Sequence, residues 1–385
     1  MIIVKNANLY TPEHVGKKDI LIEGEKIVKI ADEICVEAEQ GLLRVIDAAG
    51  KVVVPGLIDQ HVHVTGGGGE AGPASRVPES NLSDFIKAGV TTVLGLLGTD
   101  GITRSLENLY AKTKALTEEG ITAYMLTGAY GYPSPTLTGS VERDICLIDN
   151  CIGVKVAVSD HRGSNMSAQE LARLATEARR GGLITAKAGI VTIHMGDGKK
   201  GLKPVLDALK ESDLPAKTLI PTHVNCRSLE LLEECIEFCK LGASIDFTVE
   251  ATVEENVVES KKLIYLLENG VNPENISISS DAFGSQPRFD EKGNTIGLTY
   301  LTSETLLSML KALLSLEMPL EKALLFFTVN PARMMGLEGV KGVIQEGADA
   351  DIVIFDEEID ITHVIARGKV AMDEGVVVMK GRFEL

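Results

Sequence analysis

The sequence contains no tryptophan, and phenylalanine, tyrosine and tryptophan together make up only 4% of its 385 residues. Basic side chains are also scarce, because 38 Lys and Arg stand against 55 Asp and Glu, which gives a net charge of −17. Neutralising nucleic-acid phosphates requires clustered Lys and Arg, so this balance argues against a nucleic-acid-binding protein. The lack of aromatic residues argues against an aromatic-rich binding module, whereas 44% hydrophobic residues and 38 glycines favour an α/β protein.

Long apolar runs are missing as well. No stretch approaches 18 uninterrupted apolar residues, so no membrane span is expected. The N-terminal residues lack the charged start, long apolar segment and small-residue cleavage site of a signal peptide. The cysteines form no C-x-x-C pair and are typical of reduced thiols; they are Cys35, Cys146, Cys151, Cys226, Cys235 and Cys239. Together these absences predict a cytoplasmic protein that has no membrane or nucleic-acid partner.

Both ends of the chain contain short apolar segments separated by Gly, Pro or charged turns, a pattern typical of β-strands. The expected strands are Met1–Tyr10, Asp19–Ile22, Lys26–Ile30, Leu43–Asp47, Ala350–Asp356, Ile361–Arg367 and Val376–Met379. The middle of the chain has a different pattern. We therefore expect the two ends, residues 1–54 and 339–385, to form one small β-sandwich domain.

In the middle, residues 55–338, apolar runs of strand length alternate with segments of helical spacing such as Ser105–Glu119 and Ala168–Arg180. The expected strands are Val52–His63, Thr91–Gly98, Ala123–Tyr130, Ile152–Asp160, Ile190–Asp197, Thr218–Val224, Ala243–Val249 and Ile276–Gly284. Eight such repeats predict a (β/α)8 TIM-like barrel. An open doubly wound sheet is the alternative, but no G-x-G-x-x-G follows the first strand. The glycine-rich segment Gly196–Gly201 lacks P-loop spacing and is interpreted as a turn.

In a barrel of this kind, reactive groups lie at the carboxyl ends of the strands. The first barrel strand ends in His61 and His63, and alternation along a strand places both imidazoles on one face, which indicates a metal site. Lys155 lies inside the apolar fourth strand, where an ammonium ion is costly and the pKa should fall. Its side chain either reaches the barrel rim as an ammonium or reacts, as a neutral amine, with carbon dioxide to give a carbamate that bridges two metal ions.

Three further candidate ligands end later strands: His194 on the fifth, His223 on the sixth and Asp281 on the eighth. Four of the seven histidines in the chain therefore stand at predicted strand ends. The other three, His14, His161 and His363, lie in turns or at strand edges and are interpreted as structural or exposed.

These motifs, in this order, resemble the amidohydrolase superfamily with a binuclear metal centre. The segments Thr328–Ala332, Gly336-Leu337 and Gly347–Asp351 are similar to that superfamily's return into its small β domain. Within it, the loops resemble those of the isoaspartyl (β-aspartyl) dipeptidases. The matching segments are Thr65–Pro73, Gly95–Gly101, Thr127–Tyr130, Ser159–Gly163 and Ser280–Ser285. Dihydroorotases and hydantoinases share the metal ligands, but the tetraglycine–glutamate loop is not associated with them.

The resemblance implies two divalent metal ions, Zn²⁺ being the expected metal, and a carbamate on Lys155 that bridges them. It assigns His61, His63 and Asp281 to one ion and His194 and His223 to the other. A bridging hydroxide would attack the side-chain amide of a β-aspartyl dipeptide, and Asp281 would act first as general base and then as general acid. Tyr130 would donate to the developing oxyanion, and the Gly131–Ser140 segment would act as a lid.

The resemblance also implies how a dipeptide substrate is held. Glu70 would bind the α-ammonium group, Gly68 and Thr99 the aspartyl carboxylate, and Arg162 the C-terminal carboxylate. Ser285 is a further expected substrate contact. One position departs from the family pattern, because Cys226 stands where an arginine is expected and Arg227 follows it. Either Arg227 replaces that arginine or the second carboxylate contact is lost.

Two alternatives stay open at this point. One is hydrolysis of a cyclic amide or an N-acyl amino acid by the same metal centre. The other is a non-catalytic scaffold that has kept the fold, which the complete set of candidate ligands disfavours. The resemblance further implies a homo-oligomer, such as an octamer.

Overall fold

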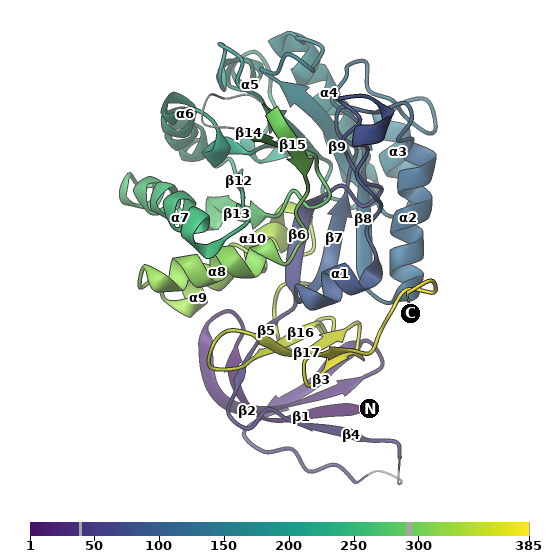
Figure 1. Cartoon of the computed structure of the whole chain (residues 1–385), viewed down its shortest axis with the longest axis vertical. Coiled ribbons are helices and arrows are strands. Elements are labelled where there is room, and N and C mark those ends of the chain that lie inside the picture. The colour runs from purple at the N-terminus through teal and green to yellow at the C-terminus, as the bar shows by residue number, and fades with distance from the viewer. Residues whose placement is uncertain (38–40, 290–294, 385) are drawn as a thin grey trace.

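The computed structural model describes residues 1–37, 41–289 and 295–384, and it divides into a large and a small part (Figure 1). The large part contains one sheet of eight parallel strands, whose order in space is their order in the sequence. The strands are β6 (Leu57–Val62), β7 (Val90–Gly95), β8 (Thr122–Gly128), β9 (Cys151–Val158), β10 (Ile190–Met195), β11 (Leu219–Thr222), β12 (Ile245–Thr248) and β13 (Ile276–Ser279).

This sheet curves until its first and last strands meet. Val62 and Ala282 form a parallel bridge, and the His63 backbone N–H donates to the Ala282 carbonyl at 2.9 Å. The Asp59 carboxylate strengthens the junction, since it accepts hydrogen bonds from the Ser280 backbone N–H at 3.1 Å and the Ser303 hydroxyl at 2.8 Å. The predicted TIM-like barrel is therefore confirmed.

Helices cover the outside of the barrel (Figure 1). They are α1 (Leu82–Lys87), α2 (Leu106–Glu119), α3 (Val141–Leu147), α4 (Ala168–Thr185), α5 (Lys203–Lys210), α6 (Leu229–Lys240), α7 (Val253–Glu268), α8 (Thr305–Ser315), α9 (Leu320–Leu325) and α10 (Val329–Met334). A hairpin of β14 (Gln286–Phe289) and β15 (Thr295–Thr299) lies at the top of Figure 1. Because helices cover the outer face of the barrel and side chains fill its interior, the residues of β6, β7, β9 and β10 are all buried.

Three predicted strands are shorter or differently divided in the structure. Val52–His63 is two strands rather than one, because β5 (Val52–Pro55) belongs to the small part and β6 begins after Gly56. A Cβ at Gly56 would lie 2.2 Å from the Thr91 hydroxyl oxygen, so only glycine fits at this crossing. β11 and β13 end before His223 and Asp281, both of which have left-handed backbone, with φ of 62° and 52°.

The small part is a nine-stranded sheet drawn from both ends of the chain, as predicted. It contains β1 (Ile2–Tyr10), β2 (His14–Glu23), β3 (Lys26–Ala31), β4 (Arg44–Asp47), β5, β16 (Ile352–Phe355), β17 (Ile361–Ala366), β18 (Lys369–Asp373) and β19 (Val376–Val377). β16 inserts between β5 and β17, and apolar residues of both chain ends share one core. The limits 1–54, 55–338 and 339–385 stay a prediction.

A buried lysine joins the two parts. Lys341 is only 3% exposed and donates to the Thr122 hydroxyl at the start of β8 and to the carboxylates of Asp349 and Asp351 next to β16. A buried ammonium is tolerated here because two carboxylates surround it. This contact lies at the end of the barrel opposite the carboxyl ends of the strands.

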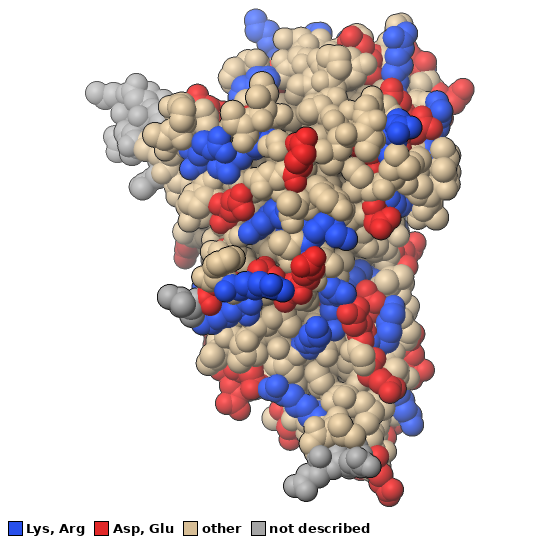
Figure 2. Space-filling view, turned by 90° about the vertical axis from the view of Figure 1, so that its right-hand side faces the viewer, with Lys and Arg blue, Asp and Glu red and all other residues tan. Residues whose placement is uncertain are grey.

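On the face of the molecule in Figure 2, acidic and basic side chains are interspersed, and no broad basic surface is visible there. All six cysteines are free thiols. Within the described ranges, no helix is both long enough and apolar enough to cross a membrane.

Candidate metal centre and active site

The six predicted metal ligands converge at the carboxyl ends of the barrel strands. His61 lies in β6 and His63 just beyond it, Lys155 in β9 and His194 in β10, and all four side chains are buried. His223 follows β11 and Asp281 follows β13, so their left-handed backbone turns their side chains towards the same space. The imidazole of His223 lies with its centroid 4.8 Å from that of His61 and 4.7 Å from that of His194.

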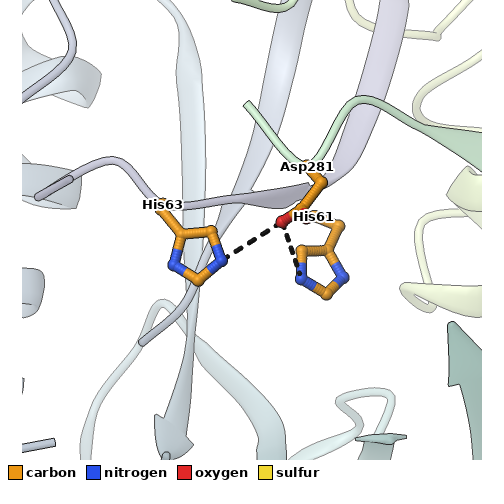
Figure 3. A group of neighbouring side chains, drawn as sticks. All are labelled: His61, His63 and Asp281. Carbon is orange, nitrogen blue, oxygen red and sulfur yellow. Dashed lines mark ion pairs between the residues drawn. The ribbon is translucent and has the colours of Figure 1, made fainter. Parts of the chain in front are cut away.

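His61, His63 and Asp281 form the tightest group, with one possible ligand atom from each lying within 4.8 Å of the others. Figure 3 shows the Asp281 carboxylate between the two imidazoles; its Oδ1 lies 3.5 Å from Nε2 of His61 and 3.2 Å from Nε2 of His63. Among the described residues, neither Asp281 Oδ1 nor His61 Nδ1 has a hydrogen-bond partner. Buried imidazoles and a carboxylate with unsatisfied atoms are a donor set that fits a divalent ion such as zinc.

Burial keeps His61, His194 and His223 neutral. Desolvation lowers the pKa of His194 to about 3 and places the pKa values of His61 and His223 well below the ordinary value. A neutral imidazole retains a lone pair, which is the form that binds a metal ion. Burial alone would raise the pKa of Asp281, but His223 and His63 outweigh it and hold that pKa low, so the carboxylate is ionised.

Lys155 is fully buried, and its Nζ lies 3.0 Å from Nε2 of His61. Desolvation lowers its pKa to about 7, although Asp281 and Asp246 act in the opposite direction. A substantial fraction of the amine is therefore uncharged near neutral pH. That is the form able to add carbon dioxide, as the carbamate hypothesis requires.

Tyr130 and Arg162 both adjoin His194. The Tyr130 hydroxyl is 2.7 Å from Nδ1 of His194, and burial raises the Tyr130 pKa well above its ordinary value. The phenol therefore stays protonated and can donate. The Arg162 guanidinium carbon lies 5.4 Å from the centre of the Tyr130 ring, and one of its nitrogens is 3.2 Å from Nε2 of His194.

Three of the predicted substrate-binding residues, Arg162, Glu70 and Thr99, are joined by hydrogen bonds. Its NH1 donates to Glu70 Oε1 at 3.1 Å, and the Thr99 hydroxyl donates to the same oxygen at 2.5 Å. A Cβ at Gly68 would lie 3.3 Å from the Ser285 side chain, so these two loops touch. The five residues therefore form two contacting groups, both in loops that follow barrel strands: Arg162, Glu70 and Thr99 in one, and Gly68 and Ser285 in the other.

Arg227 lies at the edge of this group. Its Nε donates to the Met195 carbonyl at 2.8 Å, and its NH1 lies 3.7 Å from the Asp197 carboxylate. It therefore reaches the end of β10, next to His194. Cys226 ends the short 3-10 helix η3 (Val224–Cys226) that follows His223.

The structure also places side chains at the centre that the sequence analysis gave no role. Asp160 accepts from both Arg162 and His194, and the Thr248 hydroxyl at the end of β12 lies 2.7 Å from Nδ1 of His223. Asp59 holds the loop that carries Asp281. A polar side chain at a predicted strand end was the available signal for Asp160 and Thr248, but the histidines that they meet lie 34 and 25 positions away in the sequence.

A family model described as the amidohydrolase family matches residues 52–383, which include all of these residues. The chain belongs to the amidohydrolase family. It is therefore a hydrolase of that family, and the predicted resemblance to β-aspartyl dipeptidases is confirmed by a solved structure. The β-aspartyl dipeptidase of Fervidobacterium islandicum AW-1, solved in complex with β-Asp-Leu, is 42% identical, covers 98% of both chains and has a TM-score of 0.89.

Other members are more distant. A dihydroorotase of Lactobacillus johnsonii is 25% identical over 92% of this chain and 89% of the relative. An L-hydantoinase from Arthrobacter aurescens has a TM-score of 0.65 and 18% identity, covering 99% of this chain and 98% of that one. The likeness to the hydantoinase reflects the fold alone.

Proposed function

We propose that this amidohydrolase hydrolyses β-aspartyl dipeptides. The observation that carries the proposal is the pair of opposite charges at the barrel mouth, where Arg162 and Glu70 lie 3.1 Å apart and Arg162 also adjoins His194. A β-aspartyl dipeptide has an α-ammonium group and two carboxylates, so it needs one anionic and at least one cationic group at fixed positions. The 42% identity to a dipeptidase solved with β-Asp-Leu supports the same substrate class.

The residues that would hold two divalent ions are His61, His63, Lys155, His194, His223 and Asp281. Such ions supply a water of lowered pKa and polarise the carbonyl that is attacked. Zinc as the metal and a carbamate on Lys155 belong to the proposal, as does assembly into a homo-oligomer. The donor set of imidazoles and carboxylate, without thiolates, supports a borderline or hard divalent ion.

The other steps use groups of the chain itself. The ionised Asp281 takes the proton of the attacking water and returns it to the departing amine. The protonated Tyr130 hydroxyl donates to the oxyanion that develops at the former amide carbonyl, and in the substrate complex it exchanges its bond to His194 for this one. Glu70 binds the substrate ammonium, and Arg162 binds a carboxylate through the part of its guanidinium that now meets Glu70. Thr99, Gly68, Ser285 and Arg227 complete the contacts to the dipeptide.

Hydrolysis of a cyclic amide is the second candidate, because dihydroorotases are relatives over most of the chain. Dihydroorotate carries a carboxylate but no free ammonium group. In a site built for it, the Glu70 carboxylate would have no cation of the substrate to bind and would repel its carboxylate. The charge pair therefore favours the dipeptide.

The test is an assay of the purified protein on β-Asp-Leu beside α-Asp-Leu, dihydroorotate and N-acetyl-aspartate, with the metal content of the same sample. We expect β-Asp-Leu alone to be cleaved, with close to two metal ions per chain. Cleavage of dihydroorotate in place of β-Asp-Leu would contradict the proposal and support the second candidate. If none of the four substrates is turned over after incubation with zinc and bicarbonate, the protein is a non-catalytic scaffold.

Replacing Glu70 with glutamine tests the ammonium contact. The substitution keeps the shape and the hydrogen bonds from Thr99 and Arg162 but removes the charge. We expect KM for β-Asp-Leu to rise by about 30-fold or more, with a smaller change in kcat, because the substrate ammonium loses its ionic partner. Steady-state kinetics at fixed metal content measure this, and an unchanged KM would exclude Glu70 from substrate binding.

A further inference from the structure

Asp160 follows β9, and its side chain is only 2% exposed. Its Oδ1 accepts hydrogen bonds from the Arg162 backbone N–H at 2.7 Å and from Arg162 Nε at 2.9 Å. Its Oδ2 accepts from Arg162 NH2 at 2.7 Å and lies 3.0 Å from Nε2 of His194. One carboxylate therefore contacts both a candidate metal ligand and a candidate substrate-binding arginine.

The chemistry of the carboxylate determines what its partners can do. Two groups meet Nε2 of His194, the Asp160 carboxylate at 3.0 Å and Arg162 NH2 at 3.2 Å, and that NH2 already donates to the carboxylate at 2.7 Å. Because an ionised carboxylate only accepts hydrogen bonds, Nε2 carries the proton and Nδ1 keeps the lone pair. Nδ1 is also the atom that meets the Tyr130 hydroxyl, a donor. His223 is different, because its Nδ1 meets the Thr248 hydroxyl, which can either donate or accept and so does not select a tautomer.

Asp160 also fixes how Arg162 is presented. The guanidinium uses Nε and NH2 in a two-pronged bond to Asp160, which leaves NH1 directed at Glu70. The arginine side chain is 28% exposed, so its free edge reaches the mouth of the barrel while the bonded edge is held. A fixed arginine loses less conformational freedom when it binds a carboxylate.

The surrounding backbone keeps Asp160 in place. A Cβ at Gly196, just after β10, would lie 2.4 Å from the Asp160 Cβ, and one at Gly198 would lie 2.4 Å from the Ser159 carbonyl oxygen. The glycine-rich Gly196–Gly201 segment therefore packs directly on the residues around Asp160. The Gly163 N–H in turn donates to the Asp160 carbonyl at 3.1 Å.

We propose that Asp160 is a positioning residue that couples the two halves of the site. It selects the His194 tautomer whose Nδ1 can bind a metal ion, and it holds Arg162 ready for a substrate carboxylate. The metal half depends only on the family's metal centre, whereas the substrate half rests on the proposed dipeptidase function.

The test is the D160N variant of the full-length, metal-loaded protein. The asparagine NH2 group would face donors of Arg162 and His194, so the two-pronged bond and the selection of the tautomer are both lost. We expect retention of the second zinc ion, measured by competition with a chelator, to weaken about 10- to 100-fold, as for other residues that orient metal-binding histidines. We expect KM for β-Asp-Leu, measured with saturating zinc, to rise about 10-fold or more.

Two matched variants separate this role from a general loss of stability. R162M removes the arginine alone, so KM should rise while zinc retention stays at the wild-type level. D19N alters another buried carboxylate, which accepts from Lys5 Nζ at 2.6 Å and the Asn6 N–H at 3.0 Å in the small part, and it should change neither quantity. If D160N does not fold, D160S replaces it, because its short side chain leaves room for water and presents no amide to the two donors.

Wild-type zinc retention in D160N or D160S would overturn the proposal. Zinc retention that is weakened in D19N as much as in D160N would overturn it as well. A rise in KM without any change in zinc retention would show that Asp160 serves Arg162 alone and would overturn the coupling. If the wild-type protein does not cleave β-Asp-Leu, the proposed function fails. Zinc retention still decides whether Asp160 positions His194.

Discussion

Replacing Asp281 with asparagine is expected to lower kcat for β-Asp-Leu by about 10²- to 10⁴-fold while the barrel stays folded. Asparagine has nearly the same shape but cannot accept the proton of the attacking water, and general-base catalysis contributes on this order. Asp281 also lies between His61 and His63, so metal retention should fall as well. Single-turnover kinetics at saturating zinc separate the lost proton transfer from lost metal.

The loop that carries Asp281 supplies the control. Ser303 donates to Asp59, which holds this loop, but it does not contact the ligand group. S303A should destabilise the fold slightly and lower kcat far less than D281N does. A D281N variant that retains wild-type kcat at full metal occupancy would exclude Asp281 as the base.

Replacing Lys155 with methionine is expected to separate activity from stability. The variant should bind less metal than the wild type. Its kcat/KM should be at least about 100-fold lower, because the ions supply several kcal/mol of transition-state stabilisation. The metal-free variant should nevertheless be more stable than the metal-free wild type, by about 1 kcal/mol or more. Methionine fills the same apolar space without a buried amine that is incompletely hydrogen-bonded.

The cost of burying Lys155 should also make the stability of the metal-free protein depend on pH. The folded pKa of Lys155 is lowered to about 7, whereas the unfolded side chain titrates near its ordinary value. Between these pH values the unfolded chain binds a proton that the folded chain does not. The free energy of unfolding of the metal-free wild type should therefore rise with pH, by up to about 1.4 kcal/mol per pH unit from this group.

Urea denaturation of metal-free protein at pH 7, 8 and 9 measures both quantities. K155M should show a smaller rise in the free energy of unfolding than wild type over this range. Below pH 7 both states of the wild type are protonated at Lys155, so the two proteins should have similar slopes there. Equal slopes between pH 7 and 9 would mean that Lys155 is not desolvated, which would also remove the physical basis for a carbamate.

The barrel, the small domain from both chain ends and the candidate metal ligands could all be predicted from the amino-acid sequence. The physical reason is that these features depend on local periodicity. Alternation along β6 places His61 and His63 on one face, and parallel strands bring Lys155 and His194 to the same end of the sheet. Both placements can be predicted without knowing which side chains these residues contact. Eight β–α repeats of this kind predict a (β/α)8 barrel before any contact is known.

Which side chains meet depends on the tertiary structure. Glu70 and Arg162 are 92 positions apart, and Asp160 and His194 are 34 apart. Asp59 reaches Ser280 across 221 positions to close the barrel. No local pattern encodes such pairs, because they depend on strand register, on left-handed residues such as Asp281 and on glycines that allow loops to touch. For the same reason the proposed role of Asp160 rests on a tertiary contact, since its carboxylate lies between Arg162 and His194.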